Sequence, residues 1–237
     1  MSFIIKEVRA APKELSLREI SRYLGMHPEN LSEELLERIR KLLPRFLDVL
    51  QCRVCWLELP VNCVGSKVDL HLLSVNSEHL ARNLDGCTKV VLFAATIGSA
   101  ADRLCKSASA VSPSSAVIID AMGSTAIEWF CDEFCKKLEE SFPAFELRPR
   151  FSPGYGDLPL QLQEDLIRIL DANRKIGLVL SDSFMMLPQK SVTAIVGLRP
   201  YKTPNDKGMV KRIYLIVLIA DFFIWMVEPA LICSQRG

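Results

Sequence analysis

Apolar and polar residues along the chain follow two patterns. One is a period of three to four residues, typical of helices, and the other is a continuous apolar run, typical of buried strands. After Asn30 the apolar residues recur every three or four positions, which predicts an amphipathic helix beginning near Asn30 or Ser32. Pro44 lies within it, and we expect the helix to be kinked or divided there, because proline lacks an amide donor. Ser16, followed by Glu19 at a capping-box spacing, predicts the start of an earlier helix.

Other segments are rich in apolar and β-branched residues, and we expect them to form strands. They are residues 3–9, 52–61, 67–73, 88–98, 176–188 and 191–198. Further helices are expected at residues 78–84, with Ser77 as the cap, and at residues 99–108, 115–140 and 160–170. The helix expected from 115 is apolar nearly all round in its first half and contains Gly123 and Ser124, which indicates a central position with a close backbone contact there.

The predicted strands and helices do not alternate strictly as β-α-β units, which favours an α+β fold with a long central helix. No internal repeat is present, so we predict one domain over residues 1–200. Residues 201–237 then form a turn-rich linker and an atypical apolar tail. The tail has fifteen largely apolar residues with Asp221 near the centre. A membrane span needs about twenty, so a buried element or an aberrant C-terminus is favoured over a membrane anchor.

The charge balance and the cysteines narrow the class of protein. The 29 Lys and Arg nearly balance the 28 Asp and Glu, so the chain lacks the basic excess that holds a nucleic-acid backbone, and we expect no nucleic-acid partner. The start, MSFIIKEVRA, has no basic leader before a long apolar run. The eight cysteines read as reduced thiols rather than a disulfide framework. These features predict a cytoplasmic protein.

The cysteines include two pairs with the spacing of a metal or redox site. Cys52 and Cys55 fall in a predicted strand, where positions i and i+3 point to opposite faces, and Cys63 would add only a third ligand. Cys131 and Cys135 share a helix face with phenylalanines on either side, which favours packing. We therefore interpret both pairs as core thiols.

The remaining candidates for chemistry are sparse. His27 lies in a turn, His71 in a predicted strand and His79 in a short helix, so the histidines form no cluster in the sequence. There is no nucleophile-elbow motif and no G-x-G-x-x-G pattern. Acid–base and covalent catalysis are poorly supported, and we assign no catalytic residue and no metal ligand.

The stretch RPRFSPGYGDLP, residues 149–160, is the strongest candidate site. Its prolines and glycines predict a loop of defined shape that presents Arg150 and bare backbone. In such a loop Arg150 can fork onto a carboxylate, Gly154 lets backbone approach a ligand, and Tyr155 offers a ring face. The residues alone leave open the alternative, which is a tight turn with an exposed arginine.

RFSPGYGDLPLQLQEDLIRIL and IGLVLSDSFMMLPQKSVTAIVGL together resemble the activation domain of cobalamin-dependent methionine synthase. That family has an Arg-x-x-x-Gly-Tyr loop, a helix, and a further segment rich in Ser, Met and Pro. The matching residues are Arg150, Gly154, Tyr155, Ser183, Phe184, Met185, Pro188, Ser191 and Val192. The upstream segments CTKVVLFAATIGSAADRL and AVIIDAMGSTAIEWFCDEF resemble stand-alone homologues of that domain. The resemblance covers about residues 10–200 and implies a single domain with a mostly antiparallel twisted sheet flanked by helices.

The resemblance also implies a function. In that family the domain binds S-adenosylmethionine and caps a corrinoid on a separate module, so this chain would be a reactivation subunit for a partner methionine synthase. Arg150 would hold the methionine carboxylate, and the backbone of Pro153, Gly154, Tyr155 and Gly156 would line the adenosyl moiety. The partner would carry the cobalamin, and a flavodoxin or ferredoxin would supply the electron. Positioning, rather than acid–base chemistry, would be the task of this chain.

Two other functions remain as alternatives. The first is a non-catalytic module that recognises a corrinoid protein without methyl transfer. The second is a thiol-based metal or redox protein built on Cys52, Cys55 and Cys63.

Overall fold

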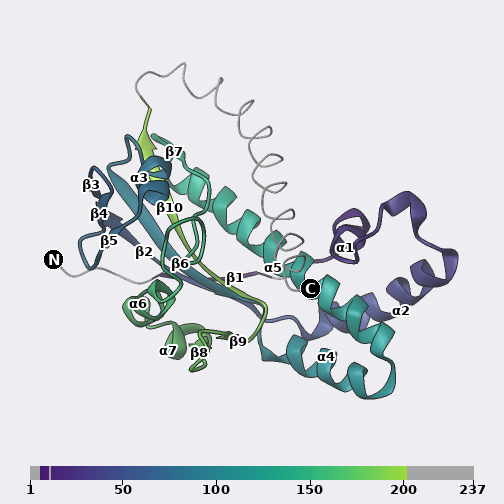
Figure 1. The fold of residues 1–237 in the computed structure, drawn as a ribbon. Helices are drawn as coiled ribbons and strands as arrows, with labels where there is room; N and C mark the ends of the chain where they lie inside the picture. Colours follow the sequence, from purple (N-terminus) through teal and green to yellow (C-terminus); the bar gives the residue numbers. More distant parts are fainter. Residues whose placement is uncertain (1–5, 11, 202–237) are drawn as a thin grey trace, which may run out of the picture.

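A five-stranded sheet lies at the centre of the computed structural model, which describes residues 6–10 and 12–201. Its order is β1-β2-β6-β10-β7, and every neighbouring pair is antiparallel (Figure 1). The strands are β1 (Lys6–Ala10), β2 (Cys52–Pro60), β6 (Lys89–Thr96), β7 (Phe145–Leu147) and β10 (Ser191–Pro200). A smaller sheet contains β3 (Asn62–Val64), β4 (Lys67–Asp69) and β5 (Ser74–Asn76), and β8 (Val179–Leu180) pairs with β9 (Met186–Leu187).

Both faces of the central sheet are buried. Trp56 and Phe93 are register partners whose side chains enter one core cluster, whereas the next pair, Leu57 and Leu92, enters a second cluster. Successive side chains of a strand point to opposite faces, so a strand buried on both sides needs an unbroken apolar run. This explains the nearly continuous apolar sequence of β6.

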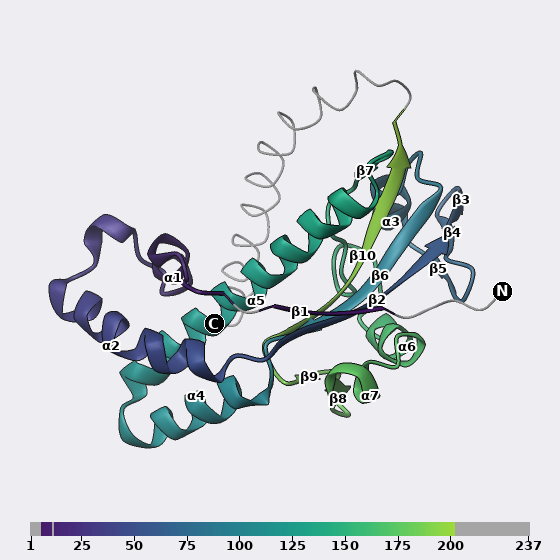
Figure 2. The same cartoon turned by 180° about the vertical axis from the view of Figure 1, so that it is seen from behind.

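Helices cover the two faces as separate layers, as the two opposite views show (Figures 1 and 2). One layer contains α1 (Leu17–Tyr23), α2 (Glu33–Val49) and the 29-residue α5 (Pro113–Ser141), with α4 (Ser99–Val111) packed beside α5. The other layer contains α3 (Glu78–Asn83), α6 (Leu162–Ile169) and α7 (Ala172–Ile176). A short 3₁₀ helix, η1 (Pro28–Asn30), connects α1 to α2.

Aromatic side chains hold α5 on the sheet. The ring of Phe134 lies 5.1 Å from that of Phe93 and 6.1 Å from that of Trp56, between centroids, and both pairs are tilted. Phe134 is buried on the sheet-facing side of the helix. The position of α5 along the sheet, and with it that of Glu128 and Asp132, therefore depends on this packing.

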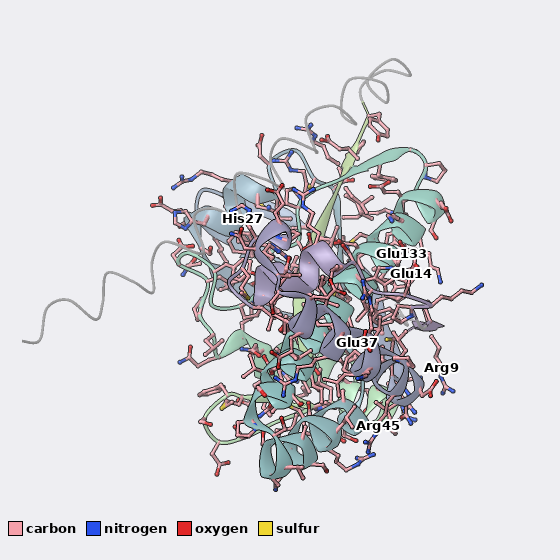
Figure 3. The ribbon with its side chains drawn as sticks, turned by 90° about the vertical axis from the view of Figure 1, so that its right-hand side faces the viewer. Arg9, Glu14, His27, Glu37, Arg45 and Glu133 are labelled. Atoms are coloured by element: carbon pink, nitrogen blue, oxygen red, sulfur yellow. The ribbon has the colours of Figure 1, made fainter. Side chains whose placement is uncertain are left out.

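Figure 3 looks onto the side of the molecule formed by α1 and α2. The exposed side chains of Glu14 and Glu37 share this side with those of Arg9 and Arg45. Among the described residues, side chains of both charge signs are thus exposed on this side.

The predicted α+β class, with a mostly antiparallel sheet and a long central helix, is confirmed. The predicted helix starts are also confirmed, since Ser16, Ser32 and Ser77 each accept a hydrogen bond from a first-turn amide. The helix that contains Pro44 is not divided, because α2 is continuous from Glu33 to Val49, with its apolar side on the core.

Three local predictions are wrong. His71 is not in a strand, because it lies after β4 with a φ of 70°. The segment 176–188 is not one strand, since α7 ends at its start and only two-residue strands follow. The close contact at Gly123 involves the aliphatic side chain of Lys190, not backbone.

Within the described residues, no helix is both long and apolar enough to cross a lipid bilayer. The apolar tail and the predicted linker lie, from residue 202 on, outside those residues. The domain boundary predicted at residue 200 therefore stays a prediction.

Phe134→Ala should lower the free energy of unfolding by about 3–5 kcal/mol, because it leaves a cavity between α5 and the sheet. Val117→Ala on the same helix is the control, since Val117 is 59% exposed and should change stability by no more than about 0.5 kcal/mol. Urea unfolding followed by circular dichroism measures both. A similar loss of unfolding free energy in the two variants would contradict the packing of α5 on the sheet through Phe134.

Candidate functional site

The 149–160 loop begins as an extension of the central sheet. Phe151 and Ile195 exchange backbone hydrogen bonds, with N···O distances of 2.9 and 2.8 Å. The amide of Arg148 donates to the carbonyl of Gly197 at 2.8 Å just before it. The first half of the loop therefore runs along β10, on the side where β7 ends.

The loop then turns sharply through its two glycines. Gly154 has a φ of +90° and Gly156 a φ of +54°, conformations that residues with a Cβ rarely adopt. The amide of Gly154 donates to the carbonyl of Leu158 at 2.9 Å, and that of Leu158 donates to the carbonyl of Tyr155 at 2.9 Å. The predicted shaped loop is thus present, and the positive φ angles of its turn favour glycine at these two positions.

Arg150 connects the loop to α5. Its Nη2 atom donates to Glu128 Oε2 and to Asp132 Oδ1, both at 2.9 Å. Glu128 and Asp132 are four residues apart, so they lie on one face of the helix. The Arg150 side chain is 21% exposed, and its Nη1 atom is buried without a hydrogen-bond partner among the described residues. A fixed guanidinium thus keeps one donor nitrogen unused.

The tyrosine and the two cysteines near Arg150 hold their protons at neutral pH. Burial, with a contribution from Glu128, raises the pKa of Tyr23 on α1 to about 12. Burial also raises the pKa of Cys131 and takes that of Cys135 to about 11, although Arg150 opposes both shifts. Since only a thiolate or a phenolate is a strong nucleophile, these side chains are not activated for covalent chemistry.

Tyr155 lies in an exposed part of the loop, which runs from Gly154 to Asp157. Its side chain is 46% exposed, and its ring packs on that of Phe151 with the centroids 6.0 Å apart at an interplanar angle of 69°. Pro153, by contrast, is buried under the turn. The loop therefore offers one supported aromatic ring next to the glycine backbone.

The structure places the five predicted site residues together in one loop: Arg150, Pro153, Gly154, Tyr155 and Gly156. Their role in binding stays a prediction. Sequence reasoning missed Glu128 and Asp132, which bind Arg150 from α5, and Tyr23 on α1, whose pKa is influenced by Glu128 and Arg150. The i, i+4 spacing of the two acids on the long helix was a usable signal, whereas nothing in the sequence pointed to Tyr23.

The predicted opposite orientation of Cys52 and Cys55 is confirmed, because the two buried thiols enter different core clusters. Burial raises the pKa of Cys52 to about 12. In the part of the chain that the structure describes, no three His, Cys, Asp or Glu side chains converge as a metal site. The thiol-based alternative therefore has no geometric support there.

A hollow of about 400 Å³ also occurs away from the loop, between the start of β2, the N-terminus of α4 and the β8–β9 hairpin. Arg53, Arg103 and Asp102 line it, and none of the loop residues does. Titratable groups with shifted pKa values lie around Arg150 rather than around this hollow. Groups with a shifted pKa occur more often at functional sites than elsewhere. The loop is therefore the better candidate.

No profile of a known protein family matches the chain, and no curated protein sequence matches it. In fold, the chain is similar to the crystal structure of the MetH reactivation domain bound to AdoHcy. The TM-score is 0.68, with 15% sequence identity over 84% of this chain and 79% of that chain. The resemblance inferred from the sequence is thereby confirmed at the level of the fold.

Gly154→Ala should lower the free energy of unfolding by about 1–2 kcal/mol, because alanine is strained at a φ of +90°. Gly154→Asn should lose less, since asparagine tolerates positive φ better than alanine. Midpoints of urea unfolding give the ranking. An unchanged midpoint for Gly154→Ala would mean that the loop does not hold this turn in solution.

Proposed function

We propose that this chain is a reactivation subunit that binds S-adenosylmethionine and supports reductive methylation of the corrinoid of a cobalamin-dependent methionine synthase. Two observations support the proposal. The fold is similar to that of a reactivation domain determined with AdoHcy bound. The loop that carries the Arg-x-x-x-Gly-Tyr motif is held in a defined shape beside a group of charged residues on α5.

The arrangement around Arg150 carries the proposal. The amino-acid end of S-adenosylmethionine has a carboxylate and an ammonium group, and its sulfonium adds a positive charge. Arg150 offers a buried donor nitrogen without a partner among the residues described, and Glu128 and Asp132 offer carboxylate oxygens beside it. These groups fit the ends of such a ligand, since charge-assisted hydrogen bonds to carboxylate and ammonium are the strong ones.

In this proposal, Arg150 holds the ligand carboxylate and the acids on α5 face the ammonium group. The backbone of Pro153, Gly154 and Gly156 lines the adenosyl moiety, and the ring of Tyr155 lies beside it. S-adenosylmethionine supplies the methyl group that cobalt receives. The chain binds and orients, which agrees with the protonated state of Tyr23 and Cys135 at neutral pH.

The proposal requires other proteins. Corrinoid-binding modules of a methionine synthase carry the cobalamin, and a flavodoxin or ferredoxin provides the electron. The chain is then one component of a methyltransferase system in the cytoplasm and makes no methionine alone.

A second candidate is a non-catalytic module that recognises a corrinoid protein. One observation favours it: Nη2 of Arg150 is already paired with two carboxylates of the chain itself. In that case the ion pairs shape the loop as a docking element and no S-adenosyl ligand is needed.

Arg150→Lys should weaken binding of S-adenosylmethionine by about 1–3 kcal/mol, because lysine keeps the charge but lacks the planar fork. Isothermal titration calorimetry measures the change. Arg148→Lys is the matched control, since Nε of Arg148 donates to the carbonyl of Asn83 at 2.8 Å, away from α5. Equal affinity in folded Arg150→Lys and wild-type protein would remove Arg150 from the site.

Mixed with an oxidised corrinoid methionine synthase, a reductant and S-adenosylmethionine, the chain should restore methylcobalamin. The absorption spectrum of the corrinoid follows the recovery, and omission of the chain is the control. Binding to the synthase without spectral recovery would instead support the non-catalytic module.

A further inference from the structure

Asp157, near the end of the 149–160 loop, binds the N-terminus of α3. The Ser77 hydroxyl donates to Oδ1, the amide of Glu78 donates to Oδ2 at 2.7 Å, and the amide of His79 donates to Oδ1 at 3.3 Å. These amides belong to the first turn of the helix, where backbone donors have no partner within the helix. A carboxylate from another part of the chain therefore satisfies them.

Gly156, the residue before Asp157, also contacts the start of α3. A Cβ at Gly156 would lie 2.0 Å from Nδ1 of His79, so the loop backbone packs directly on the imidazole ring. His79 Nδ1 also lies 3.8 Å from Oδ1 of Asp157. The loop and the start of α3 are thus in close contact over two consecutive loop residues.

This contact completes the support of the loop. Phe151 is bound to β10 and Arg150 to α5, which fixes the first half only. The second half contains Tyr155 and Gly156, and the bond from the Leu158 amide to the Tyr155 carbonyl closes the turn that contains Asp157. Holding Asp157 on α3 therefore holds the exposed part of the turn.

We propose that Asp157 is a positioning residue for the S-adenosyl ligand: its bonds to α3 hold Tyr155 and Gly156 in the arrangement that the ligand needs. This inference rests on the proposed function and adds to it a residue outside the Arg-x-x-x-Gly-Tyr motif. Asp157 acts through the loop backbone and takes no part in the chemistry.

Asp157 makes this contact as a charged carboxylate at neutral pH. The bond from Ser77, followed by those from the amides of Glu78 and His79, lowers the pKa of Asp157. Because the pKa of Asp157 is lowered in the folded chain, its carboxylate stabilises the folded loop at pH values above the ordinary pKa of aspartate. This stabilisation is lost as the pH falls through the lowered pKa of Asp157. Of the neighbouring ionisable groups, His79 faces the carboxylate, while Glu78 is paired with Arg82 at 3.1 Å.

Asp157→Asn in the full-length chain tests the proposal. The amide cannot accept all these bonds, so AdoHcy should bind about threefold to tenfold more weakly by calorimetry. Hydrogen exchange of the Gly154 and Leu158 amides should accelerate by a similar factor, because both belong to the turn. Asp165→Asn is the matched control, since the Asp165 side chain is 46% exposed on α6 and pairs with Arg168, three residues on, at 2.7 Å, and it should change neither measurement.

A second pair of variants separates positioning from a general loss of stability. Gly156→Ala should force the loop from α3, because the new Cβ meets the His79 ring, and should weaken AdoHcy binding at least as much as Asp157→Asn. Adding His79→Ala removes the obstacle and should recover much of the affinity. Recovery is not expected if the strain of alanine at Gly156 is the only defect.

Three outcomes would count against the proposal or the function on which it rests. Unchanged affinity for AdoHcy in Asp157→Asn, or no recovery in Gly156→Ala/His79→Ala, overturns the proposal. If the wild-type chain does not bind AdoHcy, the proposed function is wrong and the role of Asp157 in ligand binding falls with it. Hydrogen exchange at Gly154 and Leu158 then still decides whether Asp157 holds the loop on α3.

Discussion

Burial of the central sheet on both faces is the constraint on which the rest of the molecule depends. Side chains of β2, β6 and β10 alternate into two separate cores, so each face needs its own helical layer to exclude water. α5 provides much of one layer, and α3, α6 and α7 provide the other. A polypeptide that joins the two layers must therefore pass around the sheet, and the 149–160 loop does so beyond the end of β7.

The position of the loop explains why its supports come from distant parts of the chain. Arg150 binds α5 in one layer, Asp157 binds α3 in the other, and Phe151 pairs with β10 between them. Rigid elements on both sides thus hold a short turn whose glycines and Tyr155 remain accessible. Binding residues are commonly placed in this way, on a loop that a scaffold positions. The arrangement suits the recognition of a ligand better than acid–base catalysis, because the ionisable groups around Arg150 are paired or remain protonated.

Under the proposed function, the pairing of Arg150 with Glu128 and Asp132 would help in two ways. It would order the arginine before the ligand arrives, which lowers the conformational cost of binding. Arg150, Glu128 and Asp132 together also carry one more negative than positive charge, which would complement the ammonium and sulfonium groups of the proposed ligand. The same ion pairs give the loop its shape, so the structural and the binding interpretation of the motif share one set of contacts.

Local rules in the sequence were sufficient for much of the fold. Serine residues predicted the starts of α1, α2 and α3, and segments rich in apolar and β-branched residues predicted β6 and β10 as strands. The period of a strand placed Cys52 and Cys55 in different cores. Glycine and proline predicted that the 149–160 loop has a defined shape. Each of these features depends on neighbours within a few residues, and such information is present in the sequence itself.

Tertiary structure alone decided what the loop contacts. Arg150 meets Asp132 from 18 residues away, and Asp157 meets the amide of Glu78 from 79 residues away. Residues 176–188 were predicted as one strand but contain the two-residue strands β8 and β9, because segments so short have no measurable period of their own. α2 remained continuous at Pro44 because packing of its apolar side outweighed the lost amide bond. Contacts between distant segments arise only when the buried faces of the helices and strands are matched, and no local pattern in the sequence records that match.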